Sequence, residues 1–130
     1  MARATRTGWV EEIGRISRVW RSGEKSIREP FAPALPHIDD RAAFLAAVSG
    51  WLRERPDLID AWQAYCEDKR AGRSPYFYFD QAWKVGFCDS SVKEGARRYQ
   101  GECLHTDAVE ACADFIYREA AWVLRGVQAS

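Results

Sequence analysis

The stretch PYFYFDQAWKVGF, residues 75–87, decides the fold of this sequence. Aromatic and β-branched residues, which favour strands, lie on both sides of a short polar break at residues 80–82. The pattern predicts a β-hairpin whose side chains point alternately to the two faces of the sheet. With a turn at the polar break, one face carries Phe77, Phe79, Trp83, Val85 and Phe87. The other face carries Tyr76, Tyr78, Lys84 and Gly86.

Apolar residues recur at helical spacing in four segments outside this stretch. We expect a first helix over residues 8–21 and a third over residues 56–72. The second helix should run from a cap at Asp39 or Asp40 to residue 52, and the last from a cap at Thr106 or Asp107 to residue 124. Their apolar stripes include five tryptophans that we expect to be mostly buried: Trp9, Trp20, Trp51, Trp62 and Trp122. We expect the last helix to cover the sheet.

Two connecting segments are harder to assign. Residues 24–38 hold Pro30, Pro33 and Pro36, so we expect an ordered strap or a loop without regular structure. Residues 89–103 are ambiguous, although Arg97 to Gln100 are candidates for a third strand, which a lone hairpin needs for stability. The sequence therefore predicts an α+β fold, with four helices packed on a small antiparallel sheet built around one β-hairpin, as a single domain over residues 1–130.

Composition narrows the classes of function. With 47% hydrophobic and 29% charged residues, the chain is expected to fold as an ordinary soluble domain. The 19 basic and 19 acidic residues cancel, which argues against a nucleic-acid partner or an anionic membrane. We find no apolar leader or membrane-spanning run, and expect a cytoplasmic protein with reduced thiols.

The densest group of chemically reactive residues is Cys103, His105 and Asp107. A thiol enzyme or a zinc site is possible in principle, with Cys112 as a further ligand. However, the usual zinc spacing is missing, and residues two apart at a helix start rarely point into one pocket. We therefore expect no catalytic residue, no metal and no cofactor, and keep a small metal-dependent or thiol enzyme as an alternative.

A second alternative is an accessory protein that associates with nucleic acid. Arg97 and Arg98 would contact phosphates, and Tyr99 would stack on a base. The zero net charge makes this alternative the weaker one.

The residues most informative about binding are Tyr76, Tyr78 and Lys84, on the second face of the hairpin. Aromatic side chains at such positions either pack under a helix or contact a partner, and interfaces favour tyrosine. The third helix adds an acidic flank of Asp57, Asp60 and Glu67, which we interpret as part of the same partner-binding surface, although a solvated helix face explains it too.

The second half of the chain resembles small bacterial immunity proteins encoded beside polymorphic toxins. The similarity lies in PYFY at 75–78, WKVGF at 83–87 and ACADFI at 111–116, followed by Arg118 and Glu119. This resemblance implies a non-enzymatic protein that binds and neutralises a cognate toxin. It assigns no contact residues, because those vary within such families.

Overall fold

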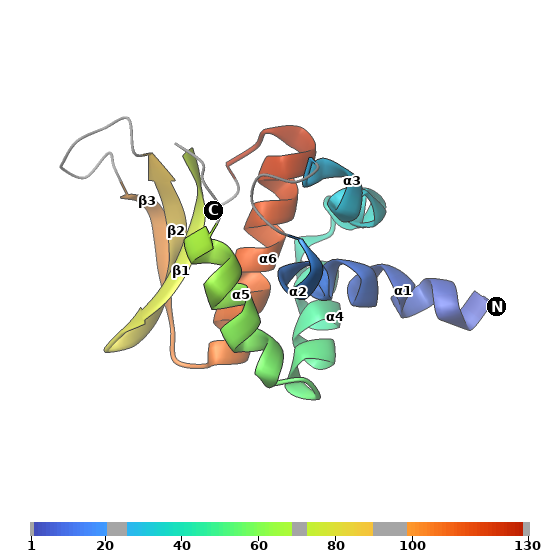
Figure 1. Cartoon of the computed structure of the whole chain (residues 1–130), viewed down its shortest axis with the longest axis horizontal. Coiled ribbons are helices and arrows are strands. Elements are labelled where there is room, and N and C mark those ends of the chain that lie inside the picture. Colours follow the sequence, from blue (N-terminus) through green and yellow to red (C-terminus); the bar gives the residue numbers. More distant parts are fainter. Residues whose placement is uncertain (1, 21–25, 69–72, 90–98, 129–130) are drawn as a thin grey trace.

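The helices lie on one side of a three-stranded antiparallel sheet in the computed structural model of the chain (Figure 1). The structure describes residues 2–20, 26–68, 73–89 and 99–128, with side chains from Gly8 onward. The longer helices are α1 (Ala2–Gly14), α4 (Arg41–Arg53), α5 (Asp57–Asp68) and α6 (Ala108–Arg125). The strands are β1 (Arg73–Asp80), β2 (Ala82–Asp89) and β3 (Tyr99–His105). Three short segments connect α1 to α4: α2 (Ile16–Val19), α3 (Arg28–Phe31) and the 3-10 helix η1 (Ala32–His37). The predicted α+β class is confirmed.

Strands β1 and β2 form the predicted hairpin. Phe77 pairs with Val85 and Phe79 pairs with Trp83, which is the expected register. Gln81 makes the turn with a φ of 65°, in the left-handed region that residues other than glycine rarely adopt. β3 pairs with β2 and completes the order β1-β2-β3, so a third strand is present. It includes Tyr99 and Gln100 of the candidate at residues 97–100, whose first two residues lie outside the described residues.

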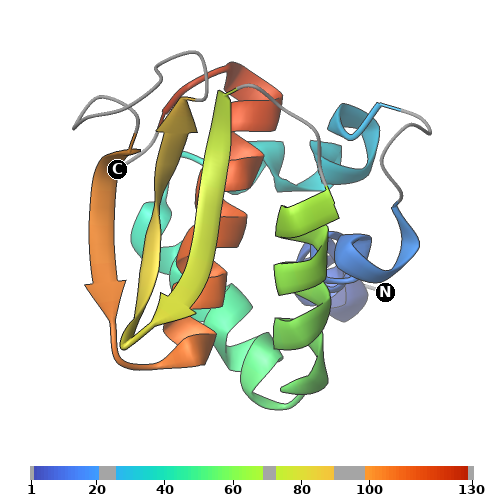
Figure 2. The ribbon, with the colours of Figure 1, turned by 60° about the vertical axis from the view of Figure 1, so that its left-hand side comes forward.

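Helix α6 is central to the molecule. It lies behind the sheet in Figure 2 and also packs against α4, α5 and α3. Every residue from Ala111 to Ala121 is buried, so α6 does more than cover the sheet. One buried charge on it, Glu119, accepts a 2.6 Å hydrogen bond from Tyr65 Oη. Burial, together with this carboxylate, raises the pKa of Tyr65.

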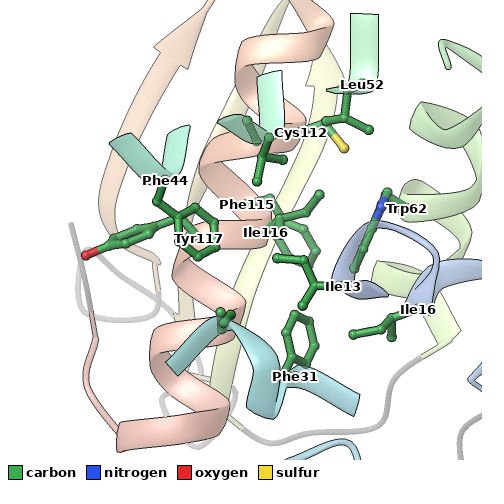
Figure 3. Packing of buried hydrophobic residues seen from close by; sticks show 14 of the residues in the cluster. Ile13, Ile16, Phe31, Phe44, Leu52, Trp62, Cys112, Phe115, Ile116 and Tyr117 are labelled. Atoms are coloured by element: carbon green, nitrogen blue, oxygen red, sulfur yellow. The ribbon is translucent and has the colours of Figure 1, made fainter. Parts of the chain in front are cut away.

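The core fills the space between α6 and the other helices (Figure 3). Trp62 is fully buried and donates a 3.1 Å hydrogen bond from Nε1 to the carbonyl oxygen of Gly14. Its ring contacts Tyr65 and Phe115 edge to face. Trp9 is buried as expected, whereas Trp20, Trp51 and Trp122 are only half-buried.

The predicted count of four helices is wrong, because the described residues hold short helical segments between α1 and α4. Pro30 lies in α3, and η1 contains Pro33 and Pro36. Proline has a φ close to the helical value, and its missing N–H costs nothing in a first turn, so single turns tolerate it. The first helix also differs: it begins at Ala2 and is interrupted at Arg15. Among the described residues, no helix is long and apolar enough to cross a membrane.

Candidate functional site

The structure brings Tyr76, Tyr78 and Lys84 together on the face of the sheet that points away from α6. We call this the outer face. The rings of Tyr76 and Tyr78 lie 5.7 Å apart, and the Lys84 ammonium lies 5.8 Å from the Tyr78 ring centroid. Tyr78 is 40% exposed. The prediction that these three residues share one face is thus confirmed, and no described helix packs on that face.

Strand β3 enlarges the outer face with residues that the sequence did not single out as part of it. Tyr99 contacts the Tyr76 ring edge to face at 5.7 Å, and Leu104, which pairs with Lys84, is 65% exposed. Tyr76 Oη donates a 2.6 Å hydrogen bond to Glu102 Oε2. Partial burial and this hydrogen bond raise the pKa of Tyr76, so the phenol stays protonated. Because residues 89–103 carry no clear alternation, sequence reasoning did not extend the face this far.

Gly86 allows Tyr76 to reach across the sheet to Glu102. A Cβ atom at this position would lie 2.6 Å from Tyr76 Oη and 3.1 Å from the Gln100 carbonyl oxygen. A side chain there would push the Tyr76 ring away from its place. The absence of a side chain at Gly86 therefore determines where the Tyr76 ring lies on the outer face.

The three acids of the flank predicted on α5 differ in their surroundings. Asp57 forms an ion pair with Arg18, on the side of α5 that faces α2. Asp60 and Glu67 are exposed on the helix surface, and α5 lies beside β1 (Figure 2). Two of the three acids are thus exposed on α5, while the third already has a cation as its neighbour.

A separate cavity of about 310 Å³ lies between α4, β3 and α6. Cys103 and His105 both line it, because residues two apart on a strand point to the same side. The sequence-based expectation that these residues do not share a pocket is wrong, since they lie on a strand and not at a helix start. Figures 1 and 2 show β3 as the strand at the edge of the sheet opposite α5.

The acid that contacts His105 in this cavity is Asp114, not Asp107. Asp114 Oδ2 lies 2.9 Å from His105 Nε2, and its Oδ1 accepts a 2.9 Å hydrogen bond from Arg118 Nε. Arg118 also donates from Nη2 to Cys103 Sγ at 3.3 Å and from Nη1 to the Gly101 carbonyl oxygen at 2.8 Å. Asp114 and Arg118 lie four residues apart on an otherwise apolar stripe of the helix. This spacing of opposite charges is the feature of the sequence that could have predicted a buried ion pair.

Asp107 has a structural place at the start of α6. Its Oδ1 accepts a 2.9 Å hydrogen bond from the Val109 N–H, and its Oδ2 accepts one of 2.7 Å from Arg53. The hydrogen bond from Arg53 is the main cause that holds the pKa of Asp107 below its ordinary value, and the bond from the backbone N–H contributes. The predicted helix cap is confirmed, and Asp107 is excluded from the group around Cys103.

The remaining residues of the metal or thiol alternative and of the nucleic-acid alternative lie in different parts of the chain. Cys112 is fully buried in the core, and burial raises the pKa of its thiol. Within the described ranges, no group of three His, Cys, Asp or Glu side chains is arranged to hold a metal ion. Tyr99 is exposed on β3, whereas Arg97 and Arg98 lie outside the described residues.

No protein-family model matches the chain, and no match is found among curated proteins or solved structures. The resemblance to small immunity proteins stays a prediction.

Proposed function

We propose that this chain is a non-enzymatic binding protein that holds a partner protein against the outer face of its sheet. The observation that carries the proposal is the contact of three tyrosine rings, Tyr76, Tyr78 and Tyr99, on a sheet face that no described helix covers. Contiguous exposed aromatic surface of this kind is typical of protein interfaces.

The physical advantage of this face is its rigidity. Tyrosine presents a large contact area with few rotatable bonds, so little conformational entropy is lost on binding. Here Tyr76 is fixed further by Glu102 and by the backbone at Gly86. Leu104 adds an exposed apolar side chain next to Lys84.

Charge favours a basic partner. Asp80 and Lys84 pair with each other at 3.6 Å and cancel, which leaves Glu102 as the remaining charge among the described residues of the outer face. Asp60 and Glu67 on the adjacent helix add two exposed negative charges. Such charges steer a basic surface during encounter and speed association more than they tighten the complex.

We propose further that the partner is a bacterial toxin with a basic cleft, and that the chain acts as its cytoplasmic immunity protein. The resemblance at residues 75–78, 83–87 and 111–116 supports this assignment. The acidic and aromatic character of the surface is suited to occupying such a cleft.

Co-expression with the product of the adjoining gene tests the proposal. We expect the wild-type chain to restore growth of a bacterial host that this product otherwise kills, and Tyr78→Ala to protect less well. Phe79→Ala is the matched control, since Phe79 is 58% exposed on the same strand but contacts Trp83 on the other face. A harmless product, or a toxic one that the chain does not neutralise, would refute the immunity assignment. Equal loss in both variants would refute the assignment of the outer face.

A further inference from the structure

We propose that Cys103 is a site of thiol–disulfide exchange, at which the chain takes up a low-molecular-weight thiol as a mixed disulfide. The proposal rests on the cavity between α4, β3 and α6, and goes beyond the binding function of the outer face. Cys103 is exposed and lines this cavity together with His105 and Asp114. It is thus an accessible nucleophile within a group of charged and polar side chains.

Arg118 is the residue that acts directly on the sulfur. Its Nη2 lies 3.3 Å from Cys103 Sγ, and an N–H from a guanidinium stabilises negative charge on an attacking or leaving sulfur. The Arg118 side chain is only 1% exposed, so water screens this interaction little.

Asp114 positions the arginine. The carboxylate accepts from Arg118 Nε at 2.9 Å and also lies within hydrogen-bond distance of His105, while the Gly101 carbonyl oxygen accepts from Nη1. With three of its nitrogens engaged, the guanidinium has little rotational freedom. Its direction toward Cys103 is therefore built into the contact between α6 and β3.

The cavity has the size and chemistry for a small thiol compound. Its volume of about 310 Å³ is at the lower end of the range for ligand pockets. Leu45 and Ala46 give it an apolar wall, and Arg41, Arg53 and Glu110 provide charges of both signs. One glutathionyl half of glutathione disulfide is a small peptide with charges of both signs, which match the charges of Arg41, Arg53 and Glu110.

The reaction itself is an exchange. The Cys103 thiolate attacks one sulfur of the disulfide, a new S–S bond forms to Cys103, and the original S–S bond breaks. The other half leaves as a thiolate and takes up the proton released when Cys103 ionised. Cys103 is oxidised and the departing half is reduced, so no further oxidant is needed.

The remaining cysteines provide internal controls. Cys112 is fully buried and its thiol pKa is raised by burial, so it should not react in the folded protein. Cys66 and Cys88 are half-buried and do not line this cavity. Selectivity for Cys103 within one chain is thus measurable without a second protein.

The test compares each cysteine in the folded chain with the same cysteine in the chain unfolded by urea. Both samples react with glutathione disulfide, are quenched with acid and are analysed by peptide mass spectrometry. We expect Cys103 to react about tenfold faster when folded, because only the folded chain supplies the Arg118 contact. The other three cysteines should react more slowly when folded. A folded rate at Cys103 equal to or below its unfolded rate would overturn the proposal.

Arg118→Lys tests the role assigned to the guanidinium. Lysine keeps the charge but lacks the planar fork whose separate nitrogens bond Asp114 and the sulfur, so the advantage of the folded state should disappear. An advantage kept in full by a folded Arg118→Lys variant would overturn the role of Arg118. If the variant does not fold, the wild-type comparison alone decides the proposal, and neither result affects the assignment of the outer face.

Discussion

Trp62 joins three parts of the core through one side chain. Its ring contacts Tyr65 and Phe115, and its N–H reaches the last carbonyl of α1 at Gly14. We expect Trp62→Ala to lower the free energy of unfolding by about 3–5 kcal/mol, because a buried ring is replaced by a cavity. Urea unfolding followed by circular dichroism measures the loss. Phe79→Ala, with a 58% exposed ring, is the control and should cost about 1 kcal/mol or less; equal losses would contradict the assigned core.

At the scale of single residues, sequence reasoning predicted some of the neighbours within the candidate sites correctly and others wrongly. Tyr76, Tyr78 and Lys84 were placed on one face because alternation in a strand requires it. Cys103 and His105 were assigned to a helix start, and this error hid their shared cavity. Asp114 lies on another element, so no local sequence pattern links it to Cys103 and His105. Only the packing of α6 on β3 brings the three residues together.

The start of α6 depends on Asp107, which caps the helix and pairs with Arg53. Asp107→Ala should lower the free energy of unfolding by about 1 kcal/mol, the usual cost of losing such a cap. Because the folded pKa lies below the ordinary value of 3.8, ionised Asp107 stabilises the fold at neutral pH. This contribution is lost as the pH falls below about 4 and through the folded pKa.

Thermal or urea unfolding between pH 2 and 7 measures this dependence. The variant should lose less stability on acidification than the wild type. Asp40→Ala is the control for the cap alone, since Asp40 accepts a 3.1 Å bond from the Ala43 N–H at the start of α4. If Asp107→Ala were less stable than the wild type by the same amount at every pH, the assigned ion pair would be contradicted.

Two helical glycines provide a matched test of how the helices pack. A Cβ at Gly14 would lie 2.3 Å from the Trp51 ring, whereas a Cβ at Gly50 would have no atom within 4 Å. We expect Gly14→Ala to destabilise the protein by about 1–3 kcal/mol through overpacking. Gly50→Ala should stabilise it by about 0.5–1 kcal/mol, because alanine favours the helix. Urea midpoints that shift in the same direction for both would contradict the contact between α1 and α4.

At the scale of elements, the strong patterns were predictive and the weak ones were not. Residues 75–87 are rich in strand-forming residues on both sides of a short polar break, and the hairpin formed in the predicted register. Strand β3 has glutamine, glycine and glutamate in place of β-branched residues, and Gly101 adopts a φ of 62°, so its sequence gives little strand signal. Pairing with β2, and not local preference, makes it a strand.

At the scale of the whole molecule, the helices gather on one side of the sheet and leave the other side uncovered by any described helix (Figure 1). The sequence alone left open whether Tyr76 and Tyr78 pack under a helix or face a partner. That choice depends on where α6 docks, and α6 packs on the side of Phe77, whose ring lies 4.8 Å from Phe115. Tyr78 is therefore exposed and Tyr76 half-buried, which periodicity could not predict.

The central claim is that the outer face holds the partner, and binding kinetics with the product of the adjoining gene test it most directly. Surface plasmon resonance should show that Tyr78→Ala raises the dissociation rate about 30-fold, the effect of losing an interface residue worth about 2 kcal/mol. The double variant Asp60→Lys/Glu67→Lys should instead slow association and flatten its salt dependence, because steering is lost. Phe79→Ala, on the opposite face, should leave both rates unchanged. Unaltered kinetics in Tyr78→Ala and in the double variant, with both folded, would contradict the claim.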